Sequence, residues 1–104
     1  MTKKDCIVGE YYAWYEGKAK NPWCIIKYTN PKGYQKDKHI IGGPIIDGGL
    51  TRFDRKDGGL HVDGRDIRIA TPEQRAWLDA CISEKKFIKK DKFKKLLKPL
   101  PLFN

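Results

Sequence analysis

The feature of this sequence that most constrains its fold is a cluster of aromatic residues near the N-terminus. Seven of the 12 tryptophans, tyrosines and phenylalanines, including all five tyrosines, lie between positions 11 and 34. Aromatic residues favour β-strands because they pack well on a pleated surface. A loop marked by Gly17 and Asn21-Pro22 divides the cluster, so we predict a hairpin with strands at residues 10–15 and 23–29.

Both faces of the first predicted strand carry aromatic side chains. Because side chains alternate between the faces of a strand, Tyr12 and Trp14 share one face while Tyr11 and Tyr15 share the other. Either both faces are covered by other parts of the chain, or one face presents aromatics to a partner. We assign four residues to the core: Tyr12, Trp14, Cys24 and Ile26. Four others stay open between core packing and binding: Tyr11, Tyr15, Trp23 and Tyr34.

Four further strands are expected after the hairpin, separated by glycine-rich turns. They are predicted at residues 38–46, 50–55, 60–62 and 65–69. Gly42-Gly43-Pro44 interrupts the first of these runs, and proline donates no ladder hydrogen bond, so that strand is expected to be bent, bulged or at an edge. Short strands and frequent turns indicate a small, bent β-barrel of about five strands.

After residue 70 the hydrophobic period changes from that of a strand to that of a helix. Thr71 is an N-cap, Pro72 occupies the first helical position, and Gln74 completes a capping box. We therefore predict a helix over residues 72–84, which makes the fold class α+β and mainly β. A chain of 104 residues is long enough for one domain, expected at residues 1–84 and followed by an extension at residues 85–104.

Positive charge is concentrated at the C-terminal end of the chain. Residues 85–104 contain eight lysines and one aspartate, a net charge of +7, which leaves +2 of the total +9 for residues 1–84. Such a basic tail suggests an anionic partner: a nucleic acid, an acidic protein or a membrane surface. We favour the first two and expect no membrane partner, because the apolar stripe of Phe93, Leu97 and Leu100 is short and narrow.

The sequence has the features expected of a cytoplasmic protein. No apolar run is long enough to cross a membrane, and the charged N-terminal residues are not followed by an apolar signal segment. The three cysteines, Cys6, Cys24 and Cys81, fit that compartment, because they are odd in number and their spacings match no zinc or redox motif.

Interleaved aromatic and basic residues are typical of a surface that binds single-stranded nucleic acid, with bases stacked on rings and phosphates held by lysines. The candidate stacking residues are Tyr11, Tyr15, Trp23 and Tyr34. The candidate phosphate-binding residues are Lys27, Lys85, Lys86, Lys89, Lys90, Lys94 and Lys95. We therefore predict a nucleic-acid-binding module in which the basic tail supplies attraction and the hairpin supplies selectivity.

Catalysis, metals and cofactors find little support in the sequence. Neither histidine belongs to a known catalytic or metal-binding motif, and no phosphate-binding loop is present. His61, Asp63 and Arg65 surround a predicted hairpin turn, which by itself is weak support for a nuclease. Asp47, Asp57 and Asp63 each precede a glycine, a pattern typical of turns. We predict that the protein is not an enzyme and holds no metal or cofactor.

Two short stretches resemble known families. Residues 8–12, Val-Gly-Glu-Tyr-Tyr, resemble the opening strand of SH3-like and Tudor-like domains. Residues 69–82, which contain the capped Thr71-Pro72-Glu73-Gln74 segment, resemble the closing helix of small proteins encoded by tailed bacteriophages. The resemblance implies a five-stranded SH3-like barrel in an accessory phage protein, which would bind DNA or a host protein in the host cytoplasm.

Two other functions stay open at this point. The protein would be a phage-encoded inhibitor or adaptor if its aromatic residues formed a hot-spot patch for a host or defence protein, and an acidic partner would suit the basic tail. It would sequester an anionic nucleotide signal if a pocket were lined by Arg52, Arg55, Arg65 and Arg68.

Overall fold

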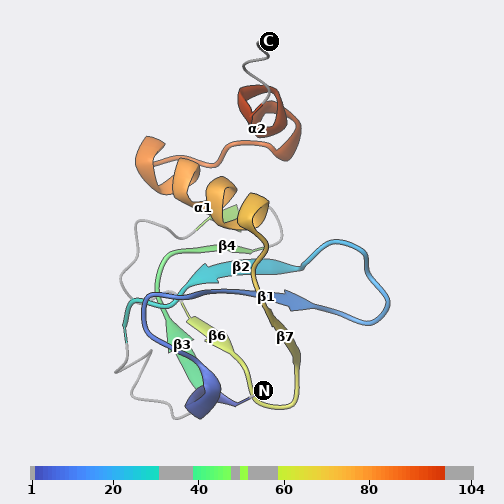
Figure 1. Cartoon of the computed structure of the whole chain (residues 1–104), viewed down its shortest axis with the longest axis vertical. Coiled ribbons are helices and arrows are strands. Elements are labelled where there is room, and N and C mark those ends of the chain that lie inside the picture. Colours follow the sequence, from blue (N-terminus) through green and yellow to red (C-terminus); the bar gives the residue numbers. More distant parts are fainter. Residues whose placement is uncertain (1, 31–38, 48–49, 52–58, 98–104) are drawn as a thin grey trace.

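The computed structural model describes residues 2–30, 39–47, 50–51 and 59–97, in which the strands outnumber the helices (Figure 1). A short 3-10 helix, η1 (Lys3–Asp5), precedes the strands. The strands are β1 (Tyr11–Tyr15), β2 (Cys24–Lys27), β3 (Ile40–Gly42), β4 (Ile45–Asp47), β5 (Leu50–Thr51), β6 (Gly59–His61) and β7 (Asp66–Ile69). Two α-helices follow, α1 (Pro72–Glu84) and α2 (Lys90–Leu97). The predicted fold class, α+β and mainly β, is confirmed.

The strands form two antiparallel sheets, and β1 lies inside the larger one. The larger sheet has the order β5-β4-β2-β1-β7, while β3 and β6 pair in a separate two-stranded ribbon. Within β1, Tyr12 lies opposite Ile26 of β2 and opposite Ile69 of β7, so β1 is paired on both sides. The predicted hairpin is therefore confirmed, and β7 extends it into a wider sheet.

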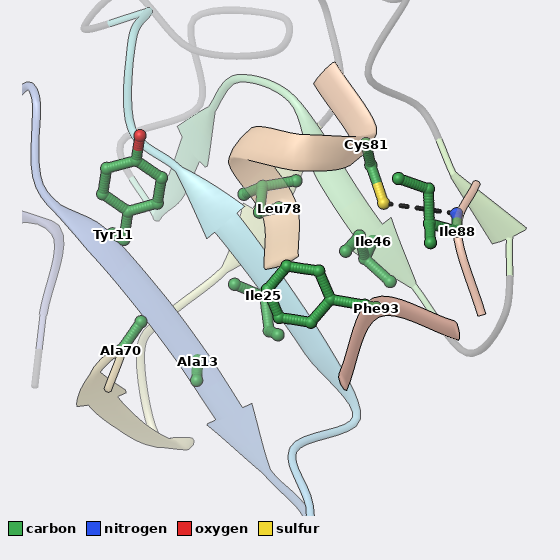
Figure 2. Close-up of a cluster of buried hydrophobic side chains, with 9 residues drawn as sticks. All are labelled: Tyr11, Ala13, Ile25, Ile46, Ala70, Leu78, Cys81, Ile88 and Phe93. Atoms are coloured by element: carbon green, nitrogen blue, oxygen red, sulfur yellow. Dashed lines mark hydrogen bonds between the residues drawn. The ribbon is translucent and has the colours of Figure 1, made fainter. Parts of the chain in front are cut away.

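Both faces of the larger sheet are covered, which explains why aromatic residues occur on both faces of β1. Figure 2 shows the buried cluster on the helical side: Tyr11, Ala13, Ile25, Ile46, Ala70, Leu78, Cys81, Ile88 and Phe93. On the opposite side, Tyr12 and Trp14 pack in a second cluster with Ile41 and Leu60 of the ribbon. The described residues therefore form three layers, in which the larger sheet separates the helices from the ribbon (Figure 1).

Gly43 lies where the chain passes from the ribbon into the larger sheet. It follows β3, precedes β4 and has a φ of +151°. A Cβ atom at this position would lie 1.8 Å from the carbonyl oxygen of Lys27, because the backbone here runs directly against β2. Only glycine is tolerated in that space. The predicted break at Gly42-Gly43-Pro44 is thus the crossing between two sheets.

The boundaries of α1 are those that its capping residues predict. Oγ1 of Thr71 accepts a hydrogen bond from the backbone N–H of Gln74 at 3.1 Å, and Oε1 of Gln74 accepts one from the N–H of Thr71 at 2.9 Å. These bonds satisfy backbone groups at the start of the helix that have no helical partner. The helix ends at Glu84, where Lys85 takes a left-handed conformation with a φ of +56°.

The first part of the basic tail packs onto α1 and the sheet. Ile88 and Phe93 are both buried in the cluster on the helical side. The indole N–H of Trp77 donates to the carbonyl oxygen of Ile88 at 2.7 Å, and the N–H of Ile88 donates to the sulfur of Cys81 at 3.4 Å. Apolar burial and these hydrogen bonds hold α2 beside α1, so core packing determines where the lysines of α2 point.

A closed barrel is not seen among the described residues. Within them, β5 and β7 each pair on one side only, and β3 and β6 pair with each other. One isolated bridge, between Asn30 and Gly42, joins the end of the hairpin to the ribbon. Most of the strand predicted at residues 50–55 lies outside the described part of the chain. Closure of the sheets into an SH3-like barrel stays a prediction.

Among the described residues, neither α1 nor α2 is long and apolar enough to cross a membrane.

Leu78 offers a direct test of the packing between α1 and the sheet. Its side chain is fully buried, so the substitution Leu78→Ala should lower the free energy of unfolding by about 2–5 kcal/mol. Ile69→Ala is the control, because Ile69 is 61% exposed and should lose about 1 kcal/mol or less. Urea denaturation of both variants measures the difference, and equal losses would contradict the assignment of this core.

Candidate functional site

Tyr11 is a core residue in the structure. Its side chain is 4% exposed, and its hydroxyl donates a hydrogen bond to the carboxylate of Asp79 in α1. The guanidinium of Arg75 lies 4.7 Å from the ring centroid, and the ammonium of Lys27 lies 5.5 Å from it. The prediction that Tyr11 is available for stacking is wrong, because α1 covers this face of β1.

The other candidate aromatics differ in their exposure. Tyr15 is half-buried; its hydroxyl accepts a hydrogen bond from Nε2 of Gln74 at 2.8 Å, and the guanidinium of Arg68 lies 4.1 Å from its ring centroid. Trp23, which directly precedes β2, is 51% exposed. Tyr34 lies outside the described residues. Among the described candidates, Trp23 and Tyr15 therefore retain surface for a ligand.

The lysines of the basic tail mostly face solvent. The exposed ones among the predicted site residues are Lys85, Lys86, Lys89, Lys94 and Lys95. Lys90 is half-buried, and its ammonium donates to Oδ1 of Asn21 in the loop between β1 and β2 at 3.1 Å. The hairpin loop and α2, which lie far apart in the sequence, are therefore in direct contact.

A pocket of about 270 Å³ lies where the hairpin loop meets α1 and α2. We call it the hairpin–helix pocket; its lining includes Tyr15, Lys20, Asn21, Trp77, Lys90 and Lys94. It thus brings together Tyr15, Lys90 and Lys94, three residues predicted to belong to one site. Trp77 and Asn21 were not among them. The sequence carries no signal for either, because the pocket forms only where the hairpin loop, α1 and α2 pack together.

A second group of polar residues lies at the ends of β3 and β6. Nδ1 of His39 is hydrogen-bonded to the carboxylate of Asp63, and this bond lowers the pKa of that carboxyl. The ring of His61 stacks on the ring of His39, with 5.8 Å between the two ring centroids. Arg65 points elsewhere, with its guanidinium 4.2 Å from the ring centroid of Trp14. His61, Asp63 and Arg65 therefore do not converge on one point. In the described part of the chain, no group of three or more His, Cys, Asp or Glu side chains is arranged to hold a metal ion.

No protein-family model, curated protein or solved structure matches this chain. The resemblance to small proteins of tailed bacteriophages accordingly stays a prediction.

The contact between Tyr11 and Asp79 can be tested by alkaline titration. Burial, and then the hydrogen bond to Asp79, raises the pKa of Tyr11 to about 12. The stabilisation from this neutral hydroxyl is complete below the ordinary tyrosine pKa of about 10 and is lost as the pH rises through about 12. In the variant Asp79→Asn, the pKa of Tyr11 should fall, because a negative charge beside the hydroxyl has been removed.

Tyrosinate absorbance measured against pH reports this change. Asp91→Asn is the matched control, since Asp91 is an exposed carboxylate in the first turn of α2. An identical titration of wild type and Asp79→Asn would contradict the contact.

Proposed function

We propose that this chain is a non-enzymatic nucleic-acid-binding module. Lysines of the basic tail contact phosphates, and Trp23 and Tyr15 contact bases. The observation that carries the proposal is the hairpin–helix pocket, in which an aromatic residue of β1 lies beside lysines of α2. The proximity of the aromatic ring to these lysines matters, because proteins that bind single-stranded nucleic acid stack bases on rings and neutralise the adjacent phosphates with basic side chains.

Electrostatics supports the same function. In the described residues 85–97, the exposed Lys85, Lys86, Lys89, Lys94 and Lys95 have few acids near them in the sequence, and Asp91 is the only acid in α2. Lysines held on a packed helix keep a fixed spacing, so several of them can engage one phosphate backbone together. Each phosphate that they neutralise releases counterions, which makes the affinity strongly salt-dependent.

The proposal depends on the two-sheet core and the helices. It does not depend on closure into an SH3-like barrel, which we keep as the finer prediction of the fold. Of the predicted stacking residues, it drops Tyr11, which is buried, and keeps Trp23 and Tyr15 as the residues that contact bases.

Binding to single- and double-stranded DNA as a function of salt concentration tests the proposal. The logarithm of affinity should fall linearly with the logarithm of salt concentration, with a slope of about 0.7 per neutralised phosphate for single strands. The double variant Lys89→Ala/Lys95→Ala should reduce that slope by about one unit or more.

The matched control is Lys3→Ala/Lys4→Ala, which removes two charges from η1, at the end of the molecule away from α2 (Figure 1). It should leave the slope nearly unchanged. Absence of binding to either form of DNA at low salt would end the proposal, and equal effects of the two double variants would move the site away from α2.

A protein partner is the second candidate, favoured by exposed apolar side chains. Trp23 and Ile69 are 51% and 61% exposed, and Ile69 belongs to β7, which pairs on one side only among the described strands. The protein would then be an inhibitor or adaptor of a host protein, with Trp23 as a hot-spot residue. The test is binding of a purified acidic protein after nuclease treatment. This function would be favoured over the first if that protein still binds and if Trp23→Ala lowers the affinity for it at least tenfold.

A further inference from the structure

The hairpin–helix pocket has two kinds of wall. Tyr15, Trp77 and Phe93 give it aromatic surface from three different elements. Its cationic groups come from the hairpin loop and from α2, and they are Lys20, Lys90 and Lys94. Among the described residues that line it, Glu73, exposed at the first turn of α1, is the one acid, so the lysines outnumber it. A ligand that suits both walls has a flat apolar body and an anionic group.

Hydrogen bonds within the protein determine which groups at the pocket can receive an anion. The carboxamide of Gln74 is engaged at both ends, since Oε1 accepts from the N–H of Thr71 and Nε2 donates to the hydroxyl of Tyr15. The N–H of Gln74 is likewise bonded to Thr71, and Pro72 has no N–H. The start of α1 therefore offers few donors, and the ammonium groups of the lysines are the ones placed to bind an anion.

The aromatic wall is preorganised for stacking. Arg68 lies over one face of the Tyr15 ring at 4.1 Å, so a ligand can stack only on the other face. Trp77 is held by the hydrogen bond from its indole N–H to Ile88, and Phe93 is buried in the core. Because these rings are already positioned, little side-chain freedom is lost when a ligand binds.

The size of the pocket limits the ligand. Its volume of about 270 Å³ is just below the range of about 300–1,000 Å³ that is usual for small-molecule sites. That space suits a single nucleotide. A base inside a duplex has both faces covered by its neighbours, so only an unstacked base can use the aromatic wall.

We propose that the hairpin–helix pocket binds one nucleotide, with the base against Tyr15 and Trp77 and the phosphate on Lys20, Lys90 and Lys94. This assignment rests on the proposed nucleic-acid binding and makes it selective for single strands. The group that the pocket recognises is a nucleoside monophosphate. It can be supplied either by one unit of a single strand or by a free mononucleotide.

The full chain, labelled with ¹⁵N, tests the assignment with two oligonucleotides that have equal numbers of phosphates. One is a run of about ten thymidines, and the other is an abasic strand of the same length. That length lies within the usual site size of single-strand-binding domains. The thymidine strand should bind at least about fivefold more tightly, which is the lower end of the effect of one stacked base. It should also shift the indole N–H signal of Trp77 and not that of Trp14, which packs on the opposite face of the sheet.

A pair of variants with equal charge loss separates the pocket from general electrostatic attraction. Lys90→Ala/Lys94→Ala removes two lysines that line the pocket, and Lys89→Ala/Lys95→Ala removes two that do not. The first should bring the preference for thymidine over abasic strands close to one. The second should weaken binding of both strands alike and keep the preference. An unchanged Trp77 indole signal in each free variant shows that α1 and α2 remain packed.

The outcomes distinguish this inference from the proposed function. Equal affinity for the two strands, an unmoved Trp77 signal, or equal effects of the two variants would overturn the pocket assignment and leave nucleic-acid binding standing. If neither strand binds at low salt, the proposed nucleic-acid binding fails, and the pocket is then tested with thymidine monophosphate alone. A shift of the Trp77 signal on adding this nucleotide would support the pocket assignment, with a free nucleotide as the ligand. No shift would overturn the assignment. A glutamate-rich peptide that shifts the Trp77 signal more strongly than the nucleotides would also overturn it.

Discussion

The alternation of side chains along β1 is the constraint on which the rest of this structure depends. Four of its five residues are aromatic, and a strand sends successive side chains to opposite faces. Neither face can stay open to water without leaving large apolar groups exposed. The helices cover Tyr11 and Ala13, and the β3–β6 ribbon covers Tyr12 and Trp14. Gly43 makes this possible, because it lets the chain cross between the sheets directly against Lys27.

The candidate site is a consequence of that packing. The cluster on the helical side includes Ile88 and Phe93 from beyond the end of α1, so the beginning of the basic tail is drawn onto the sheet (Figure 2). Once Phe93 is buried, Lys90 reaches Asn21 in the hairpin loop, and the pocket forms between them. Hydrophobic burial therefore positions the charges, and the charges lie beside aromatic surface that the core leaves partly exposed.

The features that sequence reasoning recovered are those with local causes. The capping box of Thr71 and Gln74 sets the start of α1, and the aromatic pattern sets the β1–β2 hairpin. Tyr11, by contrast, is buried for a reason that no local pattern carries. In sequence it is equivalent to Tyr15, since both lie on the same face of β1 and either can be core or surface. The difference is that Asp79 and Arg75 of α1 reach Tyr11, while Tyr15 lies at the margin of the helical layer.

By itself, the sequence determined the positions of the hairpin and of α1, the concentration of charge beyond Lys85, and the presence of aromatics on both faces of β1. Each of these follows from residue type and spacing along the chain. Only the tertiary structure decided which aromatics keep accessible surface and which lysines lie beside them. Those properties depend on contacts between distant residues, such as Trp77 with Ile88 and Lys90 with Asn21, and no local pattern encodes how two such segments meet.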